Sequence, residues 1–440
     1  STPVTASVFT RSVTPPSGGC VSACGWPVDR SRLVERLSHS PRDLLLNCYT
    51  AALAAVDGRA VVARRLRRER FTKPVHVIAI GKAAEAMTLG AHDVLGSKIA
   101  DALIVTRNPL MSLSWTVHTG GHPLPDERSL QAGRALISSI EALPGEADVL
   151  VLLSGGASAL VEFLPDGITL DDLRRVNEWL LASGLDIAAM NAVRRRLSLL
   201  KGGRLAALLG ARHVLGLAIS DVPGDDVRWI GSGPLTPIVS DEHLPNGLPA
   251  FIHELLKYAP APEQGGALNR NIRMEIVARN DDARRAAAEW AESHGIRAVA
   301  EPALVTGDAA EAGRRLALAL LESPRGLLHV WGGETTLRLP ARPGRGGRAQ
   351  HLALSAALAL AGHDGSYLLA AGSDGSDGPG EDAGALVDGG TVARGELHAG
   401  RAGEALARAD AGTFLEASGD LIQTGPTGTN VMDLMLGWRT

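Results

Sequence analysis

The sequence predicts an α/β fold whose first half is a parallel sheet covered by helices on both faces. Strands of uninterrupted apolar residues alternate with segments whose apolar residues recur at helical spacing, as in buried parallel sheets. A length of 440 residues is enough for two domains, or three, each with its own core. The sequence has 51 glycines and an aromatic content of only 3%. This composition indicates that ligands are bound by glycine-rich turns rather than by stacking on aromatic rings.

The elements of the first half follow directly from the residue pattern. Residues 1–40 are rich in Ser, Thr and Pro and are expected to be a disordered tail. Ser40 before Pro41 predicts the start of a helix that stops at Asp57-Gly58. The candidates that follow are a strand at 75–80, a helix at 83–95, a strand at 101–107, a helix at 129–143 and a strand at 149–153.

Four more strand candidates carry the pattern into the second half. Pro and Gly interrupt the sequence near residue 265, which predicts a domain junction there and domains at 41–265 and 266–440. The strand candidates lie at 213–220, 274–279, 326–332 and 366–372.

Composition excludes several classes of partner. A net charge of −4 leaves no electrostatic footprint for nucleic acid or anionic lipid, and no apolar run reaches the roughly 18 residues that span a bilayer. The three cysteines, Cys20, Cys24 and Cys48, are too few for a disulfide framework and lack partners at zinc spacing. We therefore expect a cytoplasmic protein with a small-molecule substrate, and a homodimer stays open.

The turn after the strand at 149–153 has two interpretations. Ser154, Gly155, Gly156 and Ser158 follow the strand directly, and such a turn before a helix aims N–H groups at one point, which suits phosphate. The alternative is a tight strand-to-helix turn with serine as the cap. This stretch alone does not decide between them.

Five predicted strands end in glycine beside a hydroxyl or charged residue. Ligands of α/β sheets bind beyond the carboxyl ends of strands, so five such endings favour one shared site over unrelated turns. The endings are Gly81-Lys82, Ser154-Gly155-Gly156, Ser220-Asp221 with Asp225, Gly332-Gly333-Glu334-Thr335 and Gly372-Ser373-Asp374 with Asp377.

A basic helix is predicted over 190–201, ended by Gly202-Gly203. At about 100° per residue, one face about 120° wide collects its polar side chains. Such a face is either solvated or turned inward to hold carboxylate or phosphate, for which arginine's fork of donors is suited. The side chains on this face are Asn191, Arg194, Arg195, Ser198 and Lys201.

The chain resembles class II glycerate kinases through segments that occur in that family's order. These are GKAAEAM, GHPLPD, LLSGGASAL, NAVRRRLSLLKGGRLA, ISDVPGDDVRWIGSGP, GGETT, GRGGR, GSDGSDGP and TGPTGTNV. The resemblance spans about 41–437, and about 327–437 is similar to the family's MOFRL domain.

This resemblance implies a fold and an activity. The fold would be a Rossmann-like N-terminal domain with a parallel sheet and a mixed α/β C-terminal domain, with the active site in the cleft between them. The activity would be transfer of the γ-phosphoryl group of ATP to D-glycerate, giving 2-phosphoglycerate, with Mg²⁺ required. Phosphoryl transfer needs positioned phosphates, neutralised charge, a metal ion and an aligned hydroxyl.

The resemblance and the pattern together assign residues to these roles. The catalytic residues would be Lys82, Asp221 and Arg348. The nucleotide would be held by Ser154, Gly155, Gly156, Ser158, Lys201, Gly332, Gly333, Glu334 and Thr335. The substrate would contact Asn191, Arg194, Asp374, Asp377, Thr427 and Asn430, and Mg²⁺ would contact Asp221 and Asp225.

Structural alternatives accompany these roles. Asp374 and Asp377 are also common turn residues, and Glu334 could cap a turn. His122 in GHPLPD is interpreted as fixing a loop. Lys82 could be a solvated side chain at a strand end.

The sequence departs from the family's motifs at several positions, among them His351 and Pro223, and three of the changes remove polarity or flexibility near the expected site. Ala157 stands where the family has a third glycine, and Ala349 and Met432 each stand where it has asparagine. These changes leave open which hydroxy acid is the substrate and which hydroxyl is phosphorylated. A hydroxypyruvate reductase, a kinase of another small hydroxy acid and a silent binding protein are the alternatives, although the G-x-G-x-x-G turn expected of a reductase is missing.

Overall fold

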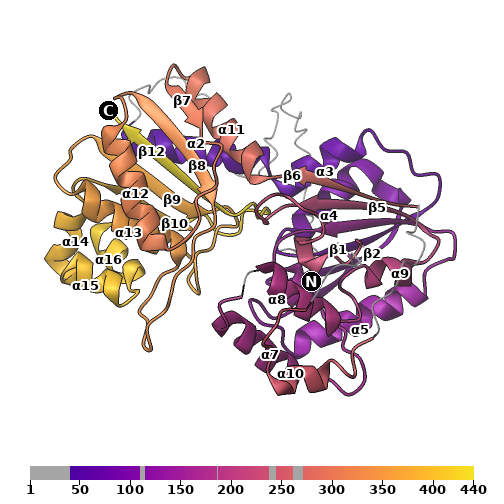
Figure 1. Cartoon of the computed structure of the whole chain (residues 1–440). Helices are drawn as coiled ribbons and strands as arrows, with labels where there is room; N and C mark the ends of the chain where they lie inside the picture. Colours follow the sequence, from indigo (N-terminus) through magenta and orange to yellow (C-terminus); the bar gives the residue numbers. More distant parts are fainter. Residues whose placement is uncertain (1–39, 110–113, 186, 237–243, 261–270) are drawn as a thin grey trace, which may run out of the picture. The chain divides into compact units, whose positions relative to one another are not determined.

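The computed structural model describes residues 40–109, 114–185, 187–236, 244–260 and 271–440 (Figure 1). Within them, two six-stranded sheets with their helices confirm the α/β class. The predicted tail before Ser40 and the centre of the predicted junction near 265 lie outside the described residues. The division at 265 and the cleft between two domains stay predictions.

The first sheet is entirely parallel, as predicted. Its order, β3-β2-β1-β4-β5-β6, is that of doubly wound nucleotide-binding folds, which bind ligands where the order reverses. Here that point lies between β1 and β4. The strands are β1 (Val75–Ile80), β2 (Ile99–Thr106), β3 (Thr116–Thr119), β4 (Asp148–Leu153), β5 (His213–Ile219) and β6 (Ile272–Ala278); β3 was not predicted.

Both faces of this sheet are buried at its centre, because the strands β1, β4 and β5 are almost entirely apolar. Val77 and Leu150 face α3 (Gly58–Leu66) and α4 (Ala84–Leu95). The alternating residues Ile78 and Val151 pack on the opposite face against α5 (Glu127–Glu141) and α9 (Arg204–Leu209). The predicted helices at 83–95 and 129–143 are therefore confirmed.

A smaller helical cluster covers one end of the first sheet. Its helices α7 (Leu170–Ala182), α8 (Ile187–Arg196) and α10 (Ala250–Leu255) share a core of their own. The prediction of one helix over 190–201 is wrong, because α8 ends at Arg196. The hydroxyl of Ser198 accepts the N–H groups of Leu200 and Lys201, which a continuing helix would direct to its own carbonyls.

The second sheet is mixed, as predicted. Its order is β11-β10-β9-β12-β8-β7, and only β7 and β8 pair in parallel. Because β12 runs antiparallel between β8 and β9, its first residue, Asp433, lies opposite their last residues, Gly333 and Gly372. The strands are β7 (Arg297–Ala300), β8 (Leu327–Gly333), β9 (Ser366–Gly372), β10 (Gly384–Asp388), β11 (Leu421–Ile422) and β12 (Asp433–Arg439).

Helices also cover the second sheet. On one face, α12 (Ala309–Glu322) and α13 (Arg348–Leu360) form a core that α15 (Ala402–Ala407) and α16 (Ala411–Ser418) extend. The remaining helix at that end is α14 (Thr391–Ala399), which lies next to α16. The other face is covered by α2 (Pro41–Ala55) and α11 (Asn280–Ser293).

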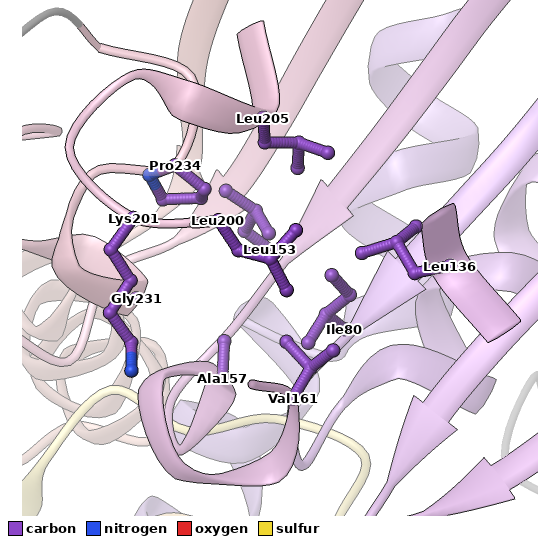
Figure 2. Close-up of a pocket in the computed structure, with 10 residues that line it drawn as sticks. All are labelled: Ile80, Leu136, Leu153, Ala157, Val161, Leu200, Lys201, Leu205, Gly231 and Pro234. Atoms are coloured by element: carbon purple, nitrogen blue, oxygen red, sulfur yellow. The ribbon is translucent and has the colours of Figure 1, made fainter. Parts of the chain in front are cut away.

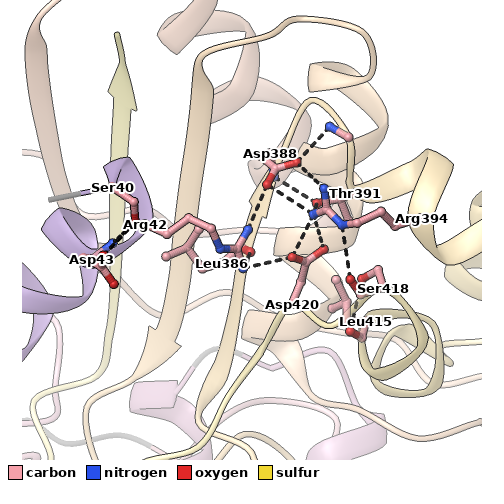
Figure 3. Close-up of polar contacts among 11 residues, drawn as sticks. Ser40, Arg42, Asp43, Leu386, Asp388, Thr391, Arg394, Leu415, Ser418 and Asp420 are labelled. Carbon is pink, nitrogen blue, oxygen red and sulfur yellow. Dashed lines mark hydrogen bonds and ion pairs between the residues drawn. The ribbon is translucent and has the colours of Figure 1, made fainter. Parts of the chain in front are cut away.

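Helix α2 joins the start of the described chain to the second sheet. Ser40 caps it by accepting the N–H of Asp43, as predicted. The hydroxyl of Tyr49 donates to the carbonyl of Gly372 at 2.6 Å. Figure 3 shows Arg42 reaching Asp388 and Asp420 beyond it.

The segment Pro41–Leu66 has the length and apolar composition of a membrane-spanning helix. In the structure it is two helices, because Asp57 accepts the N–H of Ala60 and starts α3. Leu45 and Val62, one from each helix, are buried in the protein core. Such composition is equally typical of the core helices of soluble proteins, so this segment is weak evidence for a membrane span.

Candidate active site

The turns after β1 and β4 meet where the strand order of the first sheet reverses. The N–H of Lys82 donates to the carbonyl of Gly155 at 2.9 Å, and the hydroxyl of Ser154 accepts the N–H of Ala83 at 3.0 Å. Gly81 has φ +132° and a Cβ there would lie 2.2 Å from the Ser154 hydroxyl, so only glycine fits. Ser154 therefore holds the two turns together.

Lys82 reaches from this point to the end of β9. Its Nζ lies 2.6 Å from Oδ2 of Asp374, whose other oxygen accepts the N–H of Ser376. Burial acts to raise the pKa of Asp374, but the charge and hydrogen bond of Lys82 outweigh it and lower the pKa below its usual range. This ion pair joins the two sheets through a residue that the sequence predicted on each side.

Asp221, at the end of β5, lies beside the same turns. Its Oδ2 accepts the side-chain N–H of Asn430 at 3.2 Å. A Cβ on Gly155 would lie 1.8 Å from that Asn430 nitrogen, so the main chain of the turn approaches both side chains closely. Burial and the charge of Glu334 raise the pKa of Asp221 to about 6, although Lys82 opposes the shift.

Arg348 and Glu334 lie on the second-sheet side of this site. Arg348 is the first residue of α13 and forms an ion pair with Glu334, which follows β8. The charge of Glu334 acts on the pKa values of both Asp221 and Asp433. Arg348 and Lys82 therefore flank one group of carboxylates.

Asp433 belongs to this group although the sequence did not predict it. Asp433 is 5% exposed, and its Oδ2 has no hydrogen-bond partner among the described residues. Burial, together with Asp377, Glu334 and Asp374, raises its pKa to about 7 despite the charge of Arg348. We call Asp221, Glu334, Asp374 and Asp433 the carboxylate cluster.

Other predicted residues have local structural partners. Asp377 accepts the N–H groups of Ala349 and Gln350 and so caps the start of α13. Burial raises its pKa although these hydrogen bonds oppose the shift. The hydroxyl of Thr427 donates to the carbonyl of Ser373, beside Asp374. Asp225 lies 3.7 Å from Arg279, and no ion pair or hydrogen bond joins it to the carboxylate cluster within the described part of the chain.

The segment after β8 is shaped by close backbone packing. A Cβ on Gly332 would lie 1.8 Å from Oδ1 of Asn280, and one on Gly333 would lie 2.2 Å from the carbonyl of Val305. Thr335 is fully buried, and its hydroxyl lacks a partner among the described residues. These glycines therefore allow neighbouring segments to approach β8.

A polar cavity of about 140 Å³ opens beside the Ser154 turn. Arg194 reaches it from α8, and its Nε donates to Oδ1 of Asn177 at 2.8 Å. Ser158, also in the lining, shares a hydrogen bond of 2.8 Å with Ser232. We call this space the Arg194 cavity; its lining is His122, Pro123, Pro125, Gly156, Ser158, Ala159, Leu173, Asn177, Arg194 and Lys201.

Lys201, although it lines the Arg194 cavity, already has a counter-ion. Its ammonium forms an ion pair with Glu162, whose carboxylate is fully buried and also accepts the hydroxyl of Ser198. Asn191 is buried too and accepts from the hydroxyl of Ser232 at 3.4 Å. The predicted polar face of the helix is thus turned inward, but its members divide between the cavity and internal contacts.

The three departures from the family's motifs occupy packed positions. Figure 2 shows Ala157 among apolar side chains lining a pocket of about 10 Å³ behind the turn. Ala349 is fully buried, and its N–H donates to Asp377. Met432 has φ +69°, a conformation in which asparagine is several-fold enriched over other non-glycine residues. None of the three lines the Arg194 cavity.

Comparisons with known proteins agree with the predicted resemblance. A domain of unknown function, DUF4147, matches residues 44–245, and the MOFRL family matches residues 327–433. A D-glycerate 2-kinase of Thermotoga maritima is 35% identical over 416 residues, covering 90% of this chain and 98% of that protein. A protein of Agrobacterium vitis, provisionally named a hydroxypyruvate reductase, is 36% identical over 378 residues, covering 81% and 97%. A crystal structure of the glycerate kinase of Thermotoga maritima matches with a TM-score of 0.76 and 31% identity, covering 91% of this chain and 99% of that chain.

Proposed function

Because this chain belongs to the class II glycerate kinase family, we propose that it is a D-glycerate 2-kinase that uses ATP. The observation that carries this proposal is the meeting of Lys82, Asp221 and the Glu334–Arg348 pair at the strand-order reversal of the first sheet. Phosphoryl transfer is mostly positioning and charge stabilisation, and this site offers two cations beside acidic groups.

We assign the nucleotide's phosphates to the turns after β1 and β4. Gly156 is half-buried and lines the Arg194 cavity, whereas Gly155 is buried against Asn430 and Asp221. Lys82 lies directly against Gly155 and would neutralise charge on the γ-phosphoryl group. Arg348 would meet the same group from the second sheet.

Asp221 is assigned to the substrate hydroxyl. Its raised pKa favours proton acceptance near neutral pH. As the bond from the 2-oxygen of D-glycerate to the γ-phosphorus forms, the bond from phosphorus to the bridging oxygen of ADP breaks, and the hydroxyl proton passes to Asp221. The products are 2-phosphoglycerate and ADP.

A magnesium ion fits the remaining carboxylates. Among the described residues, no group of three or more metal-ligating side chains is close enough to form a complete site, but Mg²⁺ usually binds one or two carboxylates plus phosphates. The unpartnered oxygen of Asp433, with Glu334 nearby, fits that role. The ion would supply neutralisation of phosphate charge. The sequence predicted Asp221 and Asp225, and we assign the first to the hydroxyl.

One assay tests the function. The protein is mixed with MgATP and D-glycerate, ADP release is followed, and the product is identified as 2- or 3-phosphoglycerate by its conversion with enolase. A parallel mixture holds NADH and hydroxypyruvate without ATP. ADP release with an enolase-competent product supports the proposal. NADH loss in the second mixture alone supports the reductase that one relative's name suggests, and silence in both overturns both activities.

A further inference from the structure

Arg194 is a cation in the Arg194 cavity without a counter-ion among the described residues. Among the described residues, its hydrogen bond uses Nε and goes to the neutral amide of Asn177. Burial lowers its pKa, and no described carboxylate opposes that shift. Arg194 is half-buried, and its two outer N–H groups, which meet no anion among the described residues, suit a planar carboxylate.

We propose that the Arg194 cavity is the subsite for the substrate's carboxylate, and that its size restricts the substrate to short hydroxy acids. This inference rests on the proposed kinase function and adds the residues that recognise the acid group. Asn177 was not predicted as a substrate contact, because nothing in its local sequence marks it as one, and His122, in the motif GHPLPD, was interpreted as fixing a loop.

The other charges around the cavity leave Arg194 as the anion's partner. Lys201 is already paired with Glu162. His122 is neutral, since burial and the nearby cations Lys82 and Arg107 lower its pKa to about 3. A carboxylate would therefore meet one uncompensated positive charge, with the Ser158 hydroxyl and the His122 ring as polar neighbours.

The cavity also has a suitable volume. A cavity of about 150 Å³ holds a benzene-sized molecule, so 140 Å³ suits an acid of two or three carbons and is tight for a longer one. Leu173 and Pro125 close parts of the wall. A complete nucleotide does not fit such a space.

The position of the cavity directs the substrate's hydroxyl end toward the catalytic residues. Gly156 lines the cavity, and a Cβ placed on it would lie 3.0 Å from the His122 ring and 3.5 Å from Cγ of Lys82. An acid held by Arg194 would thus extend past Gly156 toward Lys82 and Asp221. This arrangement places the acid group on one side of the turn and the reacting group on the other.

Two variants test the inference through the ratio of KM values for D-glycerate and glyceramide, its neutral amide. Arg194→Gln removes the cation, and Asn177→Asp places a carboxylate at the Nε hydrogen bond with almost no change of volume. Each is expected to raise the KM for D-glycerate by at least about tenfold, while the KM values for glyceramide and ATP stay within about twofold. The wild-type enzyme is expected to bind the four-carbon acid D-erythronate more weakly than D-glycerate.

A matched control is Arg174→Gln on the neighbouring helix α7, where Arg174 pairs with Asp171 at the surface. It makes the same change of charge and is expected to leave every KM unchanged. The inference is overturned if Arg194→Gln and Asn177→Asp raise the KM values for D-glycerate and glyceramide equally. It is also overturned if they change neither KM value.

Calorimetry separates this inference from the proposed function. D-glycerate, glycolate and inorganic phosphate are titrated into the wild-type protein and into Arg194→Gln without ATP. Binding of the carboxylates that disappears in the variant supports the subsite even if the kinase assay fails. Binding of phosphate alone, or carboxylate binding that persists in the variant, contradicts it even if the kinase assay succeeds.

Discussion

The main chain of Lys82 contacts the turn after β4, and its ammonium group pairs with Asp374 at the end of β9. We predict that Lys82→Ala lowers kcat by at least about a hundredfold, because groups that stabilise developing charge commonly supply several kcal/mol. Steady-state kinetics with D-glycerate and MgATP measures this. Lys73→Ala, which removes an exposed lysine paired with Glu146, is expected to be silent. A near-normal kcat in Lys82→Ala would remove Lys82 from the reaction.

Asp221 sets an expected pH dependence. Its pKa is raised to about 6, and a base must be ionised to accept a proton, so kcat/KM should fall about tenfold per pH unit below pH 6 and level off above it. The variant Asp221→Asn should have a low kcat/KM at every pH, without the fall below pH 6. The variant Asp433→Asn should have a lower kcat/KM but keep the fall of kcat/KM below pH 6. If that fall disappears in this variant, the titrating base is Asp433.

At the residue scale, sequence reasoning finds candidates where the chain itself places the group at a strand end. Lys82, Asp221 and Arg348 follow apolar strands or glycine motifs and were predicted. Asp433 was missed because it opens a strand instead of following one, and only the antiparallel insertion of β12 brings it opposite Gly333 and Gly372. Glu162, which pairs with Lys201, was missed because it follows a short helix with no regular pattern.

At the scale of elements, the residue pattern predicted every strand of the first sheet except β3, but not where α8 ends. The apolar and polar spacing continues through Lys201, yet Ser198 redirects two N–H groups and the N–H of Leu199 donates to the carbonyl of Phe163. Side-chain capture of the backbone and a contact from a distant segment outweigh local helical preference. Neither is encoded in the spacing of residues.

Helices α12 and α13 pack closely enough to make one glycine necessary. A Cβ on Gly313 would lie 2.1 Å from the carbonyl of Leu352. Gly313→Ala is expected to lower the free energy of unfolding by about 1–3 kcal/mol, since overpacking forces backbone shifts. Denaturant unfolding measures the effect. In the control Gly403→Ala, on α15, no atom lies within 4 Å of the new Cβ, so this variant should be neutral or slightly more stable; equal losses in both would refute close packing as the cause.

At the scale of the whole described chain, the ion pairs of Arg42 connect α2 to the second sheet. Arg42 contacts Asp388 and the almost fully buried Asp420, and Arg394 contacts both as well (Figure 3). Removing one cation leaves the buried carboxylates with the other. The loss of folding stability when Arg42 is removed should therefore be moderate rather than complete.

We predict that Arg42→Ala lowers the free energy of unfolding by about 1–3 kcal/mol, because hydrogen bonds to buried charged groups are worth about that much. Arg59→Ala removes a surface ion pair with Asp93 and should cost less than about 1 kcal/mol. Thermal or denaturant unfolding compares the two. A loss for Arg59→Ala as large as that for Arg42→Ala would contradict this role of Arg42.

The place of α2 has a consequence for synthesis on the ribosome. This helix leaves the exit tunnel before any strand of the second sheet, whereas β12, which completes the middle of that sheet, is made after all the others. Synthesis proceeds at about 5–20 residues per second, so the second sheet is completed on the order of tens of seconds after α2 is made. Until then the apolar side of α2 is not covered by the complete sheet. During that interval the apolar face of α2 is exposed to water in the nascent chain. We therefore expect chaperones to bind the nascent chain.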